Sequence, residues 1–310
     1  MILFTDPIQR PAIWGGKLLK NYFHYPQFRD DIGQSWSFSA QEGEGKSNRI
    51  LSAPYEGETL LSLWEHHPEL FQSPLSRFPV IISLVAPEDD LSLQIHPDDV
   101  QAGKEGYPTG KNEAWYFLEA EEGAKIVYGQ KTSCEAELRD RIVKDEWDRI
   151  MDFLPVHPGD FVYLPAGIVH ALKKGSIVYE IQQATDVTYR FYDYHRKDAQ
   201  GRERELHLEK AISCVHYDLS AKDAHPPVRE QKLPGAEVTS FVENSSFCVR
   251  RYRIHGSVSF DFESYQLMTC VRGSGLAEGQ PVSIGQSFLV PARTALALEG
   301  NMTLLCTSEK

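Results

Sequence analysis

The chain has 310 residues, of which 41% are hydrophobic and 25% charged, and its formal net charge is −12. These values are ordinary for a soluble globular protein, and the length is sufficient for two domains. The negative charge excludes a general nucleic-acid surface, which needs a basic patch, but a local pocket can still be positive and bind an anion. No apolar run is long enough to cross a membrane, so no membrane partner is expected.

The cysteines and the N-terminus indicate the compartment. Five cysteines are widely spaced and contain no C-x-x-C pair, which favours neither a disulfide framework nor a thiolate metal site. Met1 is followed by a short apolar run and then Asp6, without the basic segment and long apolar segment of a signal peptide. We therefore expect a cytoplasmic protein with reduced thiols.

Elements in the first half of the chain can be predicted from apolar spacing. Residues 59–70 place Leu60, Leu63 and Trp64 on one side of a short helix. Residues 80–86 form a continuous, largely β-branched run, typical of a strand buried on both faces. Residues 98–112 contain three glycines, a proline and several charges, and this composition predicts a loop.

The second half contains fewer helices than strands. Residues 132–135 match a capping box before a helix, and apolar residues from 147 to 154 recur at helical spacing. Residues 206–215 also have a helical pattern. Residues 221–235 contain three prolines and many charges, and they are the best linker candidate. Many short strands without βαβ alternation favour a mainly β barrel or sandwich with a few added helices.

An internal repeat suggests two such barrels in tandem. Residues 156–172 align with residues 282–298 without a gap, sharing valine, glycine, Pro-Ala and Ala-Leu positions. Leu296 stands where His170 stands, so the second copy lacks that histidine. We expect a catalytic domain at 1–220, a linker at 221–235 and a second, metal-free domain at 236–310.

Four residues could form a metal site if their strands line one barrel. Gln94 and His96 are two residues apart, so they share one face of a strand. Glu113 and His170 lie on other strand-like segments. Two imidazoles, a carboxylate and an amide oxygen suit a borderline cation such as zinc. Most of the eleven histidines need only surface or hydrogen-bonding roles, and these four residues stand out only as a set.

Longer motifs resemble a known family. Gly159-Asp160, four residues and then Pro165-x-Gly167-x-x-His170 resembles a motif of the cupins, which implies a double-stranded β-helix or jelly-roll barrel. Further motifs in order closely resemble the type I mannose-6-phosphate isomerases in their short bacterial form. They are Ile13-Trp14-Gly15-Gly16, Phe78-Pro79, Leu91 to Asp98, Gly110-Lys111-x-Glu113-x-Trp115-Tyr116, Pro158-Gly159-Asp160, Glu180 to Gln183, Asp186 to Tyr194 and Arg204 to His207.

The resemblance implies a zinc-dependent interconversion of mannose 6-phosphate and fructose 6-phosphate through a cis-enediol. It implies one Zn²⁺ per chain, a sugar phosphate as partner, and a monomer or homodimer. The residues that it assigns are the metal ligands Gln94, His96, Glu113 and His170, the catalytic residues Arg190 and Lys111, and the substrate contacts Trp14 and Ser83. Glu180 is a further acid/base candidate because its strand approaches the site.

Two of these residues lead to more specific expectations. Lys111 shares the strand face of Glu113, and a bound metal is expected to lower its pKa so that it can transfer a proton. Ser83 stands where the family usually has a lysine that helps bind the phosphate, so a modified phosphate pocket is expected. Ala86 also departs from the family, whose short bacterial members often have aspartate there.

Two other functions remain open at this point. The first is a catalytically inactive paralogue that binds sugar phosphates through an altered pocket at Ser83. The second is an iron-dependent cupin oxygenase that uses His96, Glu113 and His170 as a facial triad. Gln94 as a fourth ligand and the Arg190 segment speak against the oxygenase.

Overall fold

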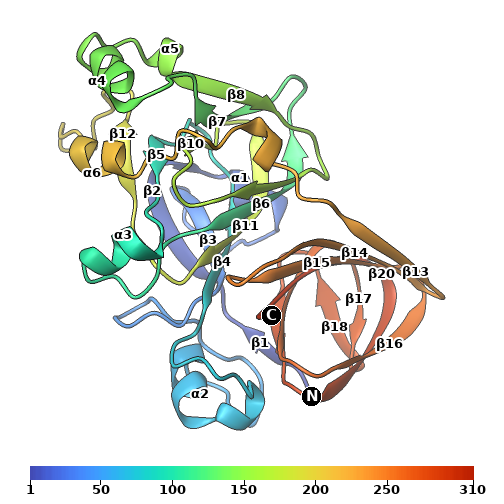
Figure 1. The fold of residues 1–310 in the computed structure, drawn as a ribbon. Coiled ribbons are helices and arrows are strands. Elements are labelled where there is room, and N and C mark those ends of the chain that lie inside the picture. Colours follow the sequence, from blue (N-terminus) through green and yellow to red (C-terminus); the bar gives the residue numbers. More distant parts are fainter.

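The computed structural model describes all 310 residues, and antiparallel β-strands dominate it (Figure 1). Two sheets form the unit that contains the candidate site. The six-stranded sheet has the order β2 (Ile8–Gly16), β3 (Ile32–Phe38), β4 (Val80–Val85), β11 (Ser176–Gln183), β6 (Glu113–Ala120) and β9 (Phe161–Leu164). The five-stranded sheet has the order β12 (Tyr189–Tyr192), β5 (Leu93–Ile95), β10 (His170–Ala171), β7 (Lys125–Gln130) and β8 (Met151–Pro155).

The third sheet has nine strands, and Figure 1 looks along its curled interior. Its main path is β1 (Leu3–Thr5), β19 (Ser287–Val290), β17 (Gln266–Ala277), β20 (Thr294–Ser308), β15 (Cys248–Ile254), β14 (Ala236–Glu243) and β13 (Arg229–Leu233). Two further strands pair off this path, β16 (Ser257–Phe262) with β20 and β18 (Gln280–Ser283) with β17. The prediction of a mainly β fold is thereby confirmed, and the two barrels in tandem stay a prediction.

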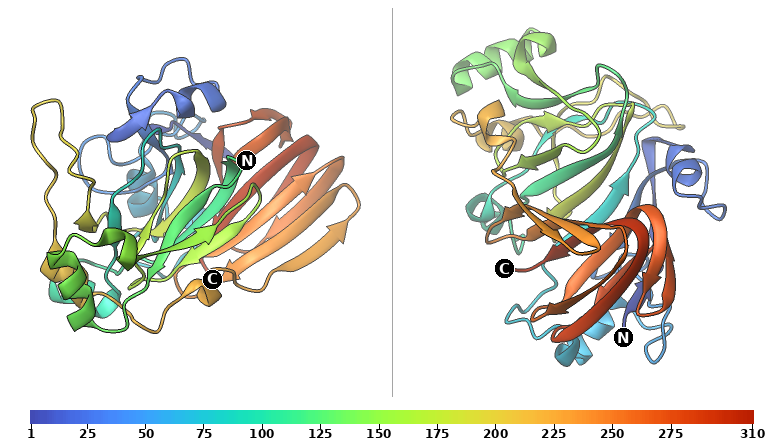
Figure 2. Two further views of the ribbon diagram at one scale, coloured as in Figure 1. Left: turned by 90° about the horizontal axis from the view of Figure 1, so that it is seen from above. Right: turned by 90° about the vertical axis from the view of Figure 1, so that its right-hand side faces the viewer.

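The helices are short and lie outside the sheets (Figures 1 and 2). They are α1 (Leu18–Tyr22), α2 (Leu60–His66), α3 (Asp99–Lys104), α4 (Glu135–Val143), α5 (Trp147–Ile150) and α6 (Leu208–Ser213), with 3₁₀ turns η1 (Pro68–Leu70) and η2 (Ala221–Asp223). None of them is both long and apolar enough to span a bilayer.

Strand alternation explains why β4 is apolar except at Ser83. Its residues Val80, Ile82 and Leu84 belong to a core cluster that also contains residues of the nine-stranded sheet. Val85 points the other way, into the cluster between the six- and five-stranded sheets. All six residues of β4 are buried, which confirms the prediction of a strand covered on both faces. The shared cluster joins the two units of the molecule through one apolar core.

The predicted repeat has a structural counterpart. Strands β9 and β19 occupy equivalent positions in the two aligned segments. The equivalent glycines Gly159 and Gly285 have φ angles of 95° and 87°, and the next pair, Gly167 and Arg293, are also positive at 86° and 53°. Both copies thus make the same strand–turn–strand path, including backbone conformations that favour glycine. This agreement supports the repeat.

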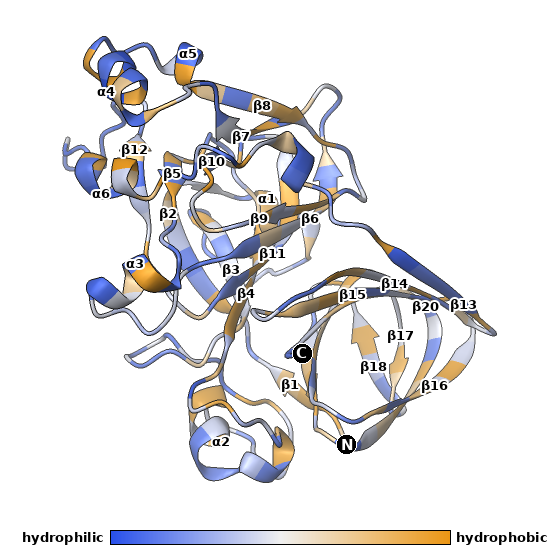
Figure 3. Cartoon of the chain, viewed as in Figure 1, coloured by the Kyte–Doolittle hydropathy of each residue, from blue (hydrophilic) through white to orange (hydrophobic).

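The division of the chain into domains stays a prediction, and two strands bear on it. β1, at the N-terminus, pairs with β19 of the C-terminal sheet. β13 lies inside the predicted linker and pairs with β14. Its exposed polar side chains give it a hydrophilic colour along most of its length (Figure 3). A charged edge strand of this kind discourages pairing with other chains.

Three local predictions were wrong in detail. Residues 98–112 are not all loop, because α3 begins after Asp98, whose Oδ1 accepts the Gln101 N–H at 2.8 Å. The helix expected over 147–154 ends at Ile150, and β8 continues from Met151. Helix α4 begins where predicted but without the capping box, since Cys134 makes no side-chain cap bond. The helices predicted within 59–70 and 206–215 are confirmed.

Candidate metal centre

Strand register brings the candidate ligands together. In the five-stranded sheet Gln94 stands directly opposite both His170 and Arg190. Residues opposite each other on neighbouring strands point to the same face, so these three side chains form a row across the sheet. Glu113 is the first residue of β6 in the other sheet, and His96 follows the end of β5. The two sheets therefore contribute to one site.

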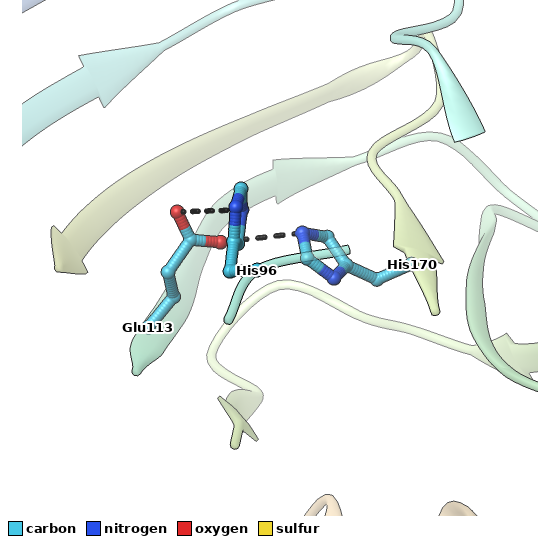
Figure 4. Close-up of side chains that lie close together, drawn as sticks. All are labelled: His96, Glu113 and His170. Atoms are coloured by element: carbon cyan, nitrogen blue, oxygen red, sulfur yellow. Dashed lines mark ion pairs between the residues drawn. The ribbon is translucent and has the colours of Figure 1, made fainter. Parts of the chain in front are cut away.

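His96, Glu113 and His170 form a compact buried cluster (Figure 4). The Nε2 atom of His96 lies 3.4 Å from Glu113 Oε1, and Nε2 of His170 lies 3.3 Å from Glu113 Oε2. One ligand atom from each residue falls within 4.8 Å of the others. None of the three residues is more than 2% exposed.

Unpaired polar atoms in this cluster fit a bound cation. Apart from the contacts at 3.3 and 3.4 Å within the cluster, both ring nitrogens of His96 and the Oε2 atom of Glu113 are buried without a hydrogen-bond partner. His170 Nδ1 lies 3.0 Å from the Ile168 carbonyl oxygen, which leaves its Nε2 directed at the cluster. Burying such atoms unpaired is costly, and coordination of a cation removes that cost. Two imidazoles and a carboxylate are ligands that zinc accepts.

The protonation states also suit metal binding. Burial, followed by the charge of Lys111, lowers the pKa of His96 to about 3, so its imidazole is neutral at physiological pH. Burial alone would raise the pKa of Glu113, but Lys111 and His96 hold it well below its usual range. A neutral imidazole and an ionised carboxylate are the forms that ligate metals.

Gln94 lies beside the cluster as a fourth candidate. Its Nε2 is 3.4 Å from His170 Nε2, and its Oε1 accepts a long hydrogen bond of 3.5 Å from Ser92. Amide oxygen and nitrogen positions are assigned from the surrounding network, and a half-turn of the amide directs the oxygen at the cluster. The structure thus places Gln94 within reach of the site, and its role as a ligand stays a prediction.

Lys111 is buried and paired with the cluster. Its Nζ lies 3.0 Å from Glu113 Oε1, and the residue is 5% exposed. Burial alone would lower the pKa of Lys111, but the charges of Glu113 and Glu180 outweigh burial and raise it. The expected lowering was tied to a bound metal, whereas the protein groups alone keep this lysine protonated.

Glu180 stands between two hydrogen-bond donors. Ser83 Oγ donates to its Oε2 at 2.8 Å, and Trp115 Nε1 donates to its Oε1 at 2.9 Å. Burial and then the charge of Glu113 raise the pKa of this carboxyl. A hydroxyl has one proton, so Ser83 cannot donate to a phosphate while it donates to Glu180. Ser83 is also fully buried.

Arg190 and Trp14 have different surroundings. Arg190 borders a cavity of about 480 Å³ whose lining includes Thr188, His207 and Lys210. Its Nε is buried without a partner, which leaves a donor free for a ligand. Trp14 is 7% exposed and packs in the core between the two sheets. A larger cavity of about 920 Å³ is lined by the N-terminal segment, by residues near 23–27 and 51–53 and by the turn before β19, and no residue of the cluster lines it.

Sequence reasoning missed two contributors to the site. Trp115 was quoted only as part of a motif, although its position two residues after Glu113 puts it on the same strand face. That spacing could have identified it as a donor to Glu180. Asn112 carries no such signal, because its side chain bonds to segments that meet only in the folded chain.

The fold and this buried His–Glu–His cluster define a cupin. A family model described as the mannose-6-phosphate isomerase cupin domain matches residues 237–308. The mannose-6-phosphate isomerase ManA of Bacillus subtilis is 36% identical, with 93% of this chain and 92% of that protein covered. A mannose-6-phosphate isomerase of Streptococcus mutans is 37% identical, with 88% and 85% covered. The chain belongs to the mannose-6-phosphate isomerase family.

Comparison with solved structures agrees with this assignment. The crystal structure of a mannose 6-phosphate isomerase from Bacillus subtilis superimposes with a TM-score of 0.94 and 33% sequence identity. The superposition covers 99% of each chain. That enzyme therefore shares the two sheets that build the cluster, and it also shares the C-terminal sheet.

Proposed function

We propose that this chain is a zinc-dependent isomerase that interconverts mannose 6-phosphate and fructose 6-phosphate. The observation that carries the proposal is the buried cluster of His96, Glu113 and His170 with Lys111 at 3.0 Å, in a chain of this family. Gln94 completes the ligand set of one Zn²⁺ per chain. Because all five cysteines are free thiols, we place the activity in a cytoplasm.

The reaction moves a hydrogen between C1 and C2, so a proton beside a carbonyl must be removed and returned through a cis-enediol. His96, Glu113, His170 and Gln94 would hold the zinc, which would supply a Lewis acid for the carbonyl. Lys111 provides a fixed positive charge next to the cluster, and developing negative charge on the substrate is stabilised by it. Glu180, whose pKa is raised, is a carboxyl suited to carrying the proton near neutral pH.

Arg190 has a positioning role in this proposal. It stands in the same row as Gln94 and His170. It also lines the cavity of about 480 Å³, although no residue of the cluster does. Its guanidinium keeps its charge and offers forked donors that match an enediolate oxygen or a phosphate. Ser83 donates to Glu180, and Trp14, which packs in the core between the two sheets, is proposed to contact the substrate.

A coupled assay on mannose 6-phosphate, with and without a chelator, tests the proposal. We expect turnover with zinc-loaded protein and its loss after chelation. The absence of turnover with fully loaded protein would overturn the assignment.

The engagement of Ser83 with Glu180 favours one alternative, a protein that binds sugar phosphates without converting them. Calorimetry with mannose 6-phosphate beside the same assay separates the two, since binding without turnover supports the alternative. The facial-triad oxygenase finds its three residues in the cluster but has no support from the relatives. Oxygen uptake and bound iron would be its signature.

A further inference from the structure

We propose that the turn between β14 and β15 of the C-terminal sheet positions the metal cluster through a hydrogen bond to Asn112. The inference rests on the proposed metal site and deepens it. Leu296 leaves the C-terminal copy without the equivalent of His170. The C-terminal copy can therefore contribute to the site only through its contacts with the first unit.

Asn112 holds the end of the strand that carries Glu113. Glu113 is the first residue of β6, so the regular ladder ends beside it. The Asn112 carbonyl accepts the Gln183 N–H at 3.1 Å. In return, the backbone N–H and the Nδ2 of Asn112 donate to Gln183 Oε1 at 2.9 and 2.8 Å. Strand ends without such bonds fray readily, which would move the carboxylate.

Asn112 is also connected to the histidines. Its Oδ1 accepts the Ala166 N–H at 2.9 Å. Ala166 belongs to the turn that leads into His170, and the next residue, Gly167, donates its N–H to the His96 carbonyl at 2.9 Å. One side chain thus links the segments that carry all three residues of the cluster.

The remaining donor of Asn112 reaches the C-terminal unit. Its Nδ2 donates to Ser246 Oγ at 3.2 Å. The turn that presents Ser246 is ordered, because Asn244 Oδ1 accepts the N–H groups of Ser246 and Phe247 at 2.9 and 3.0 Å. Phe247 is fully buried, and its ring lies 6.3 Å from that of Tyr163 on β9. The hydroxyl is therefore held in place by packing between the two units.

Loss of this hydroxyl leaves one amide donor unpaired and frees the Asn112 side chain to rotate. The cluster then loses part of its alignment, and zinc should bind more weakly. For one neutral hydrogen bond the expected change in zinc affinity is about two- to tenfold. A contact that only stabilised the fold would lower the unfolding free energy and leave zinc affinity unchanged.

The test uses the full chain with three substitutions: Ser246→Ala, Ser246→Thr, which retains the hydroxyl, and Ser245→Ala, an exposed neighbour in the same turn. Competition with a chromogenic chelator gives the zinc dissociation constant, and assays on mannose 6-phosphate give kcat and KM. We expect about two- to tenfold weaker zinc binding only in Ser246→Ala, with a larger change in kcat than in KM.

Two results would overturn the inference. The first leaves the proposed metal site intact, and the second overturns that site as well. If wild-type protein binds zinc and turns over while Ser246→Ala matches it, only the role of the turn falls. If wild-type protein binds no zinc, the proposed metal site falls as well.

Discussion

Replacing Lys111 by methionine tests whether a buried charge pair holds the cluster together. At the 3.0 Å that separates Nζ from Glu113 Oε1, an effective dielectric constant of about 20 gives an attraction of about 5 to 6 kcal/mol before desolvation is subtracted. Removing one partner of a buried pair leaves the other charge uncompensated, which typically costs about 3 to 5 kcal/mol. We expect Lys111→Met to lose that much unfolding free energy in urea at pH 7 with chelator present.

The matched control is Lys20→Met. Lys20 and Asp30 are also 3.0 Å apart, but their side chains are 29% and 55% exposed. Water screens an exposed pair of this kind, and Lys17 still lies 3.4 Å from Asp30 in the variant, so Lys20→Met should change the unfolding free energy very little. A loss below about 1 kcal/mol in both variants would refute the argument that burial makes the Lys111–Glu113 pair decisive.

Three further predictions concern the surroundings of the cluster. Ser83→Ala removes a hydrogen-bond donor from Glu180 and should raise the pKa of that carboxyl further. The pH profile of kcat should then shift to higher pH, and an unchanged profile would show that Glu180 does not carry the proton. His170→Leu copies the C-terminal repeat and should abolish zinc binding, measured by metal analysis, while circular dichroism stays that of wild type. Burial would raise the pKa of Asp193, but hydrogen bonds from two arginines lower it, so its contribution to stability exists above about pH 4 and is lost as pH falls. Asp193→Asn should flatten the acid limb of a denaturation series.

The candidate site could be predicted from the sequence because strand alternation has a fixed period. That period predicts a shared face for Gln94 and His96, and likewise for Lys111 and Glu113. In the structure His96 and Lys111 lie just beyond the strand ends, because β5 ends at Ile95 and β6 begins at Glu113. Their assembly with His170 needed the further assumption that separate strands line one interior. The observed register, with Gln94 opposite His170, supplies the geometry that spacing alone cannot give.

Other features could not be predicted because tertiary contacts decide them. Apolar spacing over 147–154 suits a helix, but pairing with β7 turns the second half into β8. Exposed, charged residues 229–233 resemble a linker, yet they pair with β14 as an edge strand. Asp98 could end a turn or cap a helix, and the fold selects the cap. The bond from Asn112 to Ser246 joins residues far apart in sequence, so no local pattern announces it.

Titration of chelator-treated protein with zinc, followed by turnover of mannose 6-phosphate, tests the central claim most directly. The buried cluster predicts that activity is absent after chelation and returns in proportion to zinc, reaching its maximum at about one equivalent per chain. Full turnover in protein shown by metal analysis to contain no divalent cation would contradict the account.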